Sequence, residues 1–156
     1  MKIVLIAVGR IKKDYIKTGA AEYVKRIKRY SPVEIVETKE EAAVAAIPTL
    51  KILDKEAKRI LENIKEGDFI IALGDKSKQY TSAGFAEFIN KLSATGKRRI
   101  CLIVGGAYGL HPSILEGADL ILSLSQMTLP HELARLVLLE QVYRAFTILR
   151  NEPYSH

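Results

Sequence analysis

Short apolar runs alternate along this chain with longer segments in which apolar residues recur every three or four positions. The runs have the length of strands and are rich in branched aliphatic residues, which is typical of strands buried on both faces of a parallel sheet. We therefore predict five strands, at residues 2–8, 33–37, 69–73, 100–104 and 120–124.

The longer segments carry the helical period. Helices are predicted at residues 14–30, 49–64, 82–93 and 130–150. We expect Thr49 and Ser82 to cap two of them, because a hydroxyl at that position accepts from the first free N–H groups. The alanine-rich segment 40–47 fits either a loop or an early helical turn. Strands alternating with helices predict one α/β domain over residues 1–156, with a mostly parallel five-to-six-stranded sheet and helices on both faces.

Composition narrows the class of protein. The chain has 156 residues, 48% of them hydrophobic, and no apolar run long enough to span a membrane, so we expect a globular protein. Its apolar start lacks a cleavage site for a signal peptide, and its single cysteine excludes an intrachain disulfide. Both features favour the cytoplasm. Cys101 lies in an apolar strand and is expected to be structural, and the three histidines lack the spacing of a metal site.

The positive charge is concentrated at one end of the chain. The first thirty residues hold nine Lys or Arg against Asp14 and Glu22, a net charge of +7, whereas the whole chain carries +6. The excess therefore belongs to the first strand and helix alone. It favours an anionic partner docked on one face, and a merely solvated helix face fits the pattern as well.

Two polar loops follow the last two predicted strands, in the sequences LIVGGAYGL (102–110) and LILSLSQMTLP (120–130). In an open α/β sheet, ligands bind outside the carboxyl ends of the strands, so the loops predict a small-molecule site. The first loop has no Lys–Ser/Thr pair after its glycines, which excludes a nucleotide-hydrolase phosphate loop. Gly9 lacks the further glycines of a dinucleotide fingerprint. A purine, a ribose and a compact cation suit these weakly charged loops, as in S-adenosylmethionine; alternatively, the glycines only end a strand and Met127 fills a core gap.

The carboxyl-terminal sequence from GGAYGLHPS to NEPY resembles the ribosomal RNA large subunit methyltransferase H family, within the SPOUT class. The combined motifs GGxxG, LSxMTLPH, YRA and NxPY carry the resemblance. It extends upstream through FIIALGDKSKQYTSAGFAEFI to the opening MKIVLIAVGRIK, and so covers essentially the whole chain.

This resemblance implies a carboxyl-terminal trefoil knot and a homodimer that binds S-adenosylmethionine in the knot, near the subunit interface. It also implies methylation of N3 of a pseudouridine in a stem-loop of large-subunit (23S) rRNA, on the assembled ribosome and without a metal. The cofactor contacts carried over by motif are Leu73, Gly105, Leu124, Ser125, Gln126, Met127, Thr128 and Leu129.

The same resemblance points to catalytic residues near the carboxyl terminus. Tyr154 lies in the NxPY motif, and His156 follows it after Ser155, whereas the family places a histidine directly after the tyrosine. Either the histidine has shifted by one position or the terminus is not the natural one, so the proton acceptor stays open. Glu140 and Arg144 share a helix face, either as a surface ion pair or as an RNA-phosphate contact in which Glu140 orients Arg144.

RNA docking has a physical basis in the basic first unit, because cations that contact phosphates position RNA without reading its sequence. The expected contacts are Arg10, Lys12, Lys13, Lys17, Lys25, Lys28 and Arg29. Two alternatives to the rRNA enzyme stay open: a SPOUT methyltransferase that acts on tRNA, and a non-catalytic RNA-binding protein of ribosome assembly. His131, at the start of the last helix, is expected either to donate to the cofactor loop or to cap the helix.

Overall fold

The computed structural model describes residues 1–43 and 47–154, in which five parallel strands form one sheet. The strands are β1 (Lys2–Val8), β2 (Val33–Thr38), β3 (Phe69–Lys78), β4 (Arg99–Val104) and β5 (Leu120–Leu122). Their order across the sheet is β2-β1-β4-β3-β5, so β1 and β4 lie next to each other at its centre. The predicted α/β class and all five predicted strands are confirmed.

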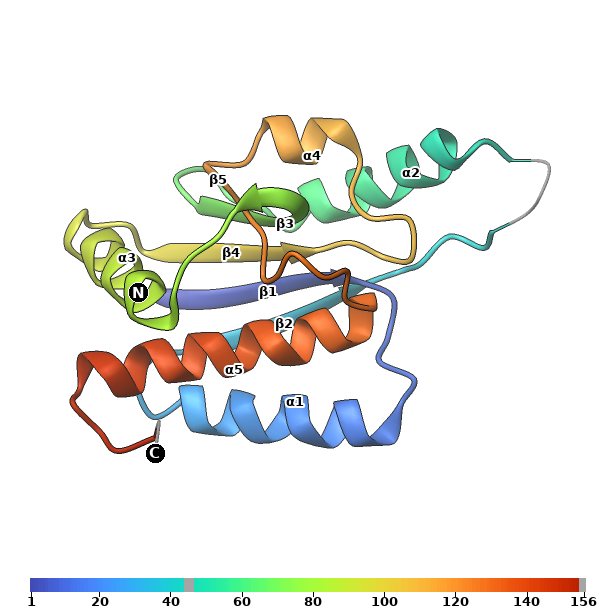
Figure 1. Cartoon of the computed structure of the whole chain (residues 1–156). Helices are drawn as coiled ribbons and strands as arrows, with labels where there is room; N and C mark the ends of the chain where they lie inside the picture. The colour runs from blue at the N-terminus through green and yellow to red at the C-terminus, as the bar shows by residue number, and fades with distance from the viewer. Residues whose placement is uncertain (44–46, 155–156) are drawn as a thin grey trace.

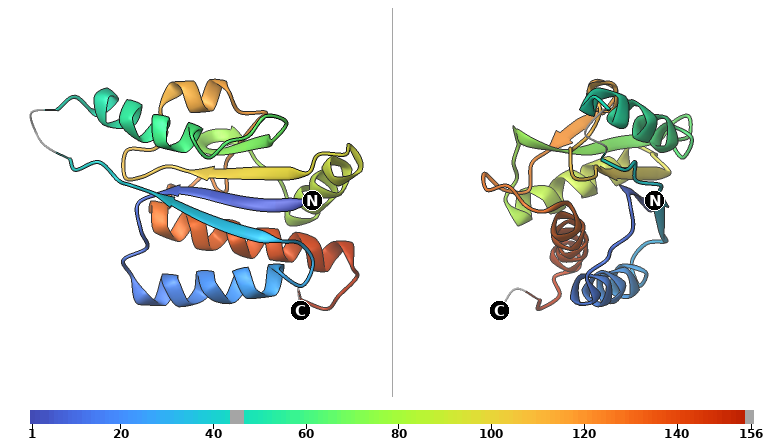
Figure 2. Two further views of the ribbon diagram at one scale, coloured as in Figure 1. Left: turned by 180° about the vertical axis from the view of Figure 1, so that it is seen from behind. Right: turned by 90° about the vertical axis from the view of Figure 1, so that its right-hand side faces the viewer.

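Five helices cover the two faces of this sheet (Figures 1 and 2). They are α1 (Asp14–Ile27), α2 (Thr49–Leu61), α3 (Ser82–Ala94), α4 (Pro112–Glu116) and α5 (His131–Leu149). The helices α1, α3 and α5 pack on one face, and α2 and α4 pack on the other. Within the described residues, no helix is long and apolar enough to cross a membrane.

The core has one layer on each side of the sheet, as the side-chain alternation of β1 shows. Ile3 and Leu5 of β1 belong to the cluster with α1, α3 and α5, whereas Val4 and Ile6 belong to the cluster with α2 and α4. All four are at most 2% exposed. Since successive residues of a strand point to opposite faces, an unbroken apolar run is what a strand covered on both sides requires.

Several predicted boundaries and caps were wrong in detail. The residue that caps α3 is Thr81, whose hydroxyl accepts from Gly84 N at 3.0 Å, and Ser82 is already helical. Thr49 likewise lies inside α2, whose N-cap is Pro48. The short helix α4 was not predicted, because five residues are too few to show a helical period.

The predicted trefoil knot of the carboxyl-terminal third stays a prediction. Of the segment 40–47, residues 40–43 and 47 are not helical, and residues 44–46 lie outside the described part of the chain. The carboxyl ends of β3, β4 and β5 meet at one edge of the sheet, beside the start of α5 (Figure 1). This edge carries the two loops singled out by the sequence.

Candidate functional site

The glycine loop after β4 is a tight reversal that requires Gly105. Gly106 and Gly109 pair in an isolated antiparallel bridge, and Gly109 N donates to Gly106 O at 3.1 Å. A Cβ on Gly105 would lie 2.2 Å from the carbonyl oxygen of Gly109. Any side chain there would force the two arms of the loop apart, so the glycine permits the backbone approach that closes the turn.

Two serines hold the loop after β5 in shape. Ser123, 5% exposed, donates through its hydroxyl to Ser125 O at 2.9 Å and accepts from Gln79 Nε2 at 3.3 Å. Ser125 Oγ accepts from Met127 N at 3.0 Å. Met127 itself is 79% exposed, so the alternative in which it fills a core gap is wrong. The loop is thus an ordered wall whose tip stays open to a partner.

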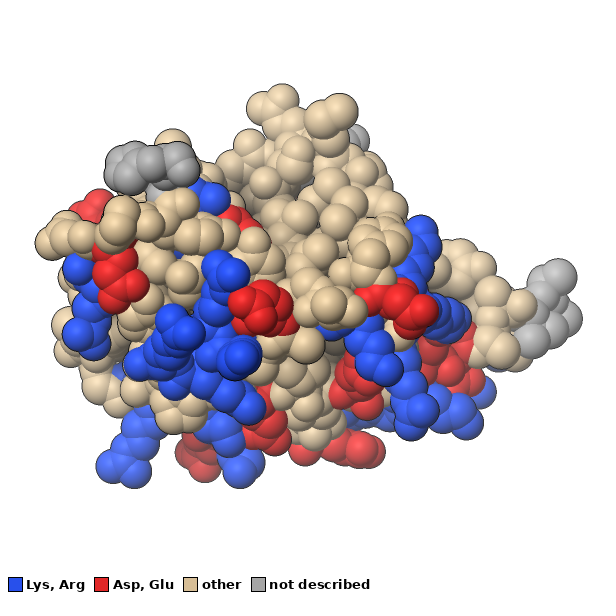
Figure 3. Space-filling model, turned by 90° about the horizontal axis from the view of Figure 1, so that it is seen from below, with Lys and Arg blue, Asp and Glu red and all other residues tan. Residues whose placement is uncertain are grey.

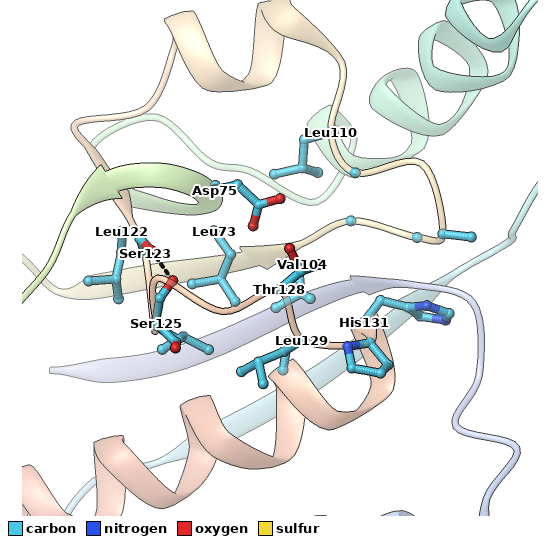
Figure 4. Close-up of a pocket in the computed structure, with 18 of the residues that line it drawn as sticks. Leu73, Asp75, Val104, Leu110, Leu122, Ser123, Ser125, Thr128, Leu129 and His131 are labelled. Carbon is cyan, nitrogen blue, oxygen red and sulfur yellow. Dashed lines mark hydrogen bonds between the residues drawn. The ribbon is translucent and has the colours of Figure 1, made fainter.

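A pocket of about 630 Å³ lies between these loops and the start of α5 (Figure 4). Its volume is typical of sites for small molecules and cofactors. Among its lining residues are Leu73, Gly105, Leu124, Ser125, Met127, Thr128 and Leu129. Seven of the eight residues carried over as cofactor contacts therefore surround one cavity. Gln126 is exposed and is not among the described lining residues.

Strand β3 adds to this pocket, beyond the predicted Leu73, a residue that sequence reasoning did not predict, Asp75. Leu73 and Lys78 of β3 both pair with Leu122 of β5, so the residues between them bulge out of the ladder. The bulge begins at Gly74, where a Cβ would lie 2.7 Å from Ile121 Cγ2. It carries Asp75 over the cavity, and bulges commonly re-aim a side chain in this way. A lone Asp after an apolar strand gives no signal that would have revealed this.

His131, the first residue of α5, lines the same pocket. Its position agrees with a contact to a bound ligand, whereas Pro130 occupies the N-cap and no side-chain cap bond forms there. The buried carboxylate of the next residue, Glu132, accepts from Lys12 N at 3.1 Å and Lys13 N at 3.2 Å. Burial opposes ionisation of Glu132, but these two N–H donors lower its pKa. The start of α5 is thereby tied to the loop before α1.

Tyr154 lies at the other end of α5, in a cluster of polar and aromatic side chains. Its hydroxyl donates to Glu140 Oε1 at 3.2 Å, and Tyr23 Oη lies 3.1 Å away. Either hydroxyl can be the donor in the contact between Tyr23 and Tyr154. The ring of Tyr154 packs edge-on against Tyr143, with centroids 4.7 Å apart.

The Glu140–Arg144 pair forms the polar side of this cluster. Both Nε and Nη2 of Arg144 donate to Glu140 Oε1, at 2.9 and 2.6 Å, and the guanidinium lies 4.7 Å from the ring centroid of Tyr154. The bond to Glu140 raises the pKa of Arg144. Burial, the bond with Tyr23 and the negative charge of Glu140 raise the pKa of Tyr154. The phenol therefore stays protonated at neutral pH, as a hydrogen-bond donor.

The pocket and the Tyr154 cluster are separated within one chain. The pocket touches α5 at His131 and Ala134, whereas the cluster is built on Glu140 and Arg144. Along the helix, Glu140 lies about 9 Å and Arg144 about 15 Å beyond Ala134. One chain alone does not bring its predicted catalytic residues to its predicted cofactor residues. His156 lies outside the described part of the chain.

The seven cations expected to contact RNA are all exposed. They do not form one continuous patch. Figure 3, which views the molecule from below, shows Lys and Arg side chains in separate groups with acidic side chains between them. One group of predicted cations precedes α1, where Lys12 Nζ lies 3.3 Å from Glu40 Oε2. The other, with Lys25, Lys28 and Arg29, lies at the carboxyl-terminal end of α1, where Lys25 is in the last turn and Lys28 is the C-cap. In the described residues, no cluster of three or more His, Cys, Asp or Glu could hold a metal ion.

Comparison with known proteins finds relatives that match this chain over its full length. A family model described as "Predicted SPOUT methyltransferase" matches residues 1–156. The chain is 46% identical over 156 residues to Ribosomal RNA large subunit methyltransferase H of Syntrophotalea carbinolica, covering 100% of this chain and 99% of that relative. It is 45% identical over 157 residues to the protein of the same name from Bacillus pumilus, with 99% of each chain covered.

Solved structures agree at the level of the fold. The tRNA (m1G37) methyltransferase from Aquifex aeolicus superposes with a TM-score of 0.53 at 17% identity, over 92% of this chain and 70% of that one. A protein described as a probable methyltransferase from Bordetella pertussis gives a TM-score of 0.53 at 15% identity, over 92% and 95%. At such identities the likeness concerns architecture alone.

Proposed function

We propose a function from one premise: this chain belongs to the family of SPOUT methyltransferases. We infer that it methylates N3 of a pseudouridine in a stem-loop of large-subunit rRNA, on the assembled ribosome, with S-adenosylmethionine as the methyl donor. One observation carries the proposal. The loops after β4 and β5 enclose a cavity of cofactor size, in a chain that is 46% identical over its full length to a protein named as an rRNA methyltransferase.

The pocket residues suit S-adenosylmethionine in shape and chemistry. Leucines 73, 110, 115, 122, 124 and 129 line it and would enclose an adenine ring. Backbone groups of the two loops are available to the polar edges of the base and the ribose, since the Gly105 turn brings bare backbone to the cavity. Leu73, Gly105 and the run from Leu124 to Leu129 would hold the cofactor, and His131 would contact it from α5.

The bound cofactor would supply a methyl group on a sulfonium, which is already electrophilic. The protein then has two tasks: to align the pseudouridine with that methyl, and to provide for the proton of N3. Tyr154 suits alignment, because its raised pKa keeps the phenol protonated, and the proton that it donates to Glu140 here would turn to a carbonyl of the base when substrate binds. Arg144, which Glu140 orients, would contact a phosphate. The acceptor of the N3 proton stays open.

We further propose that the enzyme works as a homodimer in which each tail serves the pocket of its partner. The separation along α5 supports this, since the Tyr154 cluster is built on Glu140 and Arg144, about 9 and 15 Å along the helix from the pocket residue Ala134. A twofold dimer with antiparallel α5 helices would bring each Tyr154 cluster to the other pocket. Substrate binding would then depend on both subunits.

The basic groups on either side of α1 would hold the ribosomal RNA by its phosphates. Because they lie apart, they suit a large folded RNA that reaches both groups better than a single short duplex. The rRNA function is favoured over a tRNA function by the relatives: the full-length ones bear the rRNA name, and the tRNA enzyme shares only the fold.

Mapping of modified nucleotides in a strain that lacks this gene separates these functions. We expect large-subunit rRNA to lose one N3-methylpseudouridine, detected by mass spectrometry, while its tRNA modifications stay unchanged. Loss of a modification from tRNA, with the rRNA still methylated, would favour the tRNA enzyme. Failure of the purified dimer to bind S-adenosylmethionine in a calorimeter would favour the non-catalytic RNA-binding protein.

A further inference from the structure

The pocket has an uneven charge. Of the described residues that line it, Asp75 is the one whose side chain is charged at neutral pH, and the rest are apolar, hydroxyl-bearing, glycine or histidine. A carboxylate next to leucine side chains and bare backbone sets the electrostatic potential of such a cavity, because no other fully charged side chain is among the described lining residues.

The fold aims this carboxylate at the cavity. The bulge of β3 lifts the backbone between Leu73 and Lys78 out of the sheet ladder, and Asp75 lies within it. Gly74 allows the bulge to lie against Ile121 of β5, since a Cβ there would approach to 2.7 Å. Figure 4 shows the carboxylate of Asp75 turned into the space that Leu110 and Thr128 border.

Asp75 is also available to a ligand. Its side chain is exposed, and among the described residues none forms an ion pair or a side-chain hydrogen bond with it. Its backbone oxygen, by contrast, accepts from Ser77 Oγ at 3.2 Å, which helps to hold the bulge. The backbone is thus held, while no described side chain pairs with the carboxylate, as expected of a group that meets a cation from solution.

We propose that Asp75 lets the pocket distinguish S-adenosylmethionine from its product, S-adenosylhomocysteine. The inference rests on the proposed function and deepens it. The substrate has a sulfonium, an ammonium and a carboxylate, and so carries one net positive charge. The product has lost the methyl and with it the sulfonium charge, and is neutral overall. The carboxylate attracts the first more strongly than the second, which favours exchange of product for substrate after each turnover.

Calorimetric titration of the purified protein with each of the two molecules tests this. Asp75→Asn removes the charge and keeps the shape. We expect it to weaken binding of S-adenosylmethionine about tenfold and binding of S-adenosylhomocysteine less than about twofold. Higher salt should reduce the preference of the wild-type protein for the substrate and should leave the Asn variant nearly unaffected.

Glu116→Gln is the matched control. Glu116 is an exposed carboxylate at the end of α4, next to the pocket residue Leu115 but not itself in the lining, and its replacement removes the same charge. We expect it to change neither affinity. Thermal unfolding of both variants at the wild-type temperature confirms that the bulge and the helix are intact.

Two results would overturn the assignment of Asp75 while the proposed function stands. One is unchanged binding of S-adenosylmethionine by Asp75→Asn. The other is a loss that is not specific, either equal for both molecules or matched by Glu116→Gln. If the wild-type protein bound neither molecule, the proposed function itself would be contradicted, and the role of Asp75 with it.

Discussion

Tyr154 illustrates how single residues carry the proposed chemistry. Its hydroxyl is shared with Tyr23 and Glu140, and its ring lies against Arg144 and Tyr143. The NxPY sequence singled out this residue, but not its partners, because they lie in α1 and α5, far away along the chain. The environment defines a protonated phenol that is held in place by its own subunit.

Tyr154→Phe removes the hydroxyl and keeps the ring. We expect turnover to fall roughly tenfold to a hundredfold, because the aligned donor is lost. The affinity for S-adenosylmethionine should change less than about twofold, since Tyr154 is not a pocket residue of its own chain. Steady-state kinetics on ribosomes and calorimetry separate the two effects. Tyr15→Phe, at a tyrosine that is 66% exposed on α1, is the control, and wild-type turnover by Tyr154→Phe would exclude a catalytic tail.

Cys101 makes an independent prediction about stability. It is 0% exposed in β4, and its thiol donates to Asp68 Oδ2 at 3.1 Å. Burial and the Asp68 carboxylate raise its pKa from the ordinary 9.0 to about 12. A raised pKa in the folded state means that the folded protein holds its proton more tightly than the unfolded chain. Its contribution to stability is therefore complete below pH 9 and is lost as the pH rises toward 12.

Cys101→Ala should flatten this alkaline loss. Between pH 9 and 10 we expect the free energy of unfolding of the wild-type protein to fall by up to ~1.4 kcal/mol more than that of the variant. Urea titrations at pH 8, 9 and 10 measure this difference in unfolding free energy. The pH range excludes most of the effect of Tyr30, because burial and the bond to Glu152 raise the pKa of that tyrosine from 10.0 to about 12. Parallel pH dependence of the two proteins would contradict the assignment.

At the scale of elements, the carboxyl-terminal end of α1 is expected to hold RNA. Replacing Lys25, Lys28 and Arg29 by Ala should weaken ribosome binding and flatten its dependence on salt, because fewer phosphates are neutralised. The control replaces Lys51, Lys55 and Lys58 of α2, three exposed cations on the other face of the sheet. Sedimentation binding assays over a range of salt give both slopes. A slope unchanged by the α1 variant would make this group a merely solvated helix face.

The elements also show what a single sequence can predict. Strands such as β1 were predicted to the residue, because burial on both faces demands an unbroken apolar run. Both pocket loops were predicted as well, since ligand sites lie where parallel strands end. The bulge at Asp75 was not, because it depends on how β3 meets β5. The cap at Thr81 was missed since Ser82, the next residue, fits the same rule.

At the scale of the whole molecule, the separation of pocket and tail favours the proposed active site shared between two chains. Sequence motifs named candidate residues for both halves, but no motif records which subunit supplies which half. The position of Tyr154 and the pocket at different ends of α5 is what favours a dimer with shared sites. A mixed dimer tests this arrangement.

In such a dimer one subunit carries Gly105→Ala, whose Cβ would meet Gly109 O at 2.2 Å and disrupt the pocket, and the other carries Tyr154→Phe. Each homodimer should be nearly inactive. If tails serve the partner's pocket, the mixed dimer keeps one complete site and about half of the wild-type activity. Purification through two different tags isolates it. A mixed dimer as inactive as its parents would place pocket and tail of the same chain in one site.

The central claim is that this chain methylates large-subunit rRNA at a pseudouridine. Its most direct measurement uses purified protein, S-adenosylmethionine labelled in its methyl group, and ribosomes from a strain that lacks the gene, followed by mass mapping of the RNA. We predict one labelled methyl per ribosome, on N3 of a single pseudouridine in the large-subunit rRNA. Label absent from rRNA, or found on another base, would contradict it.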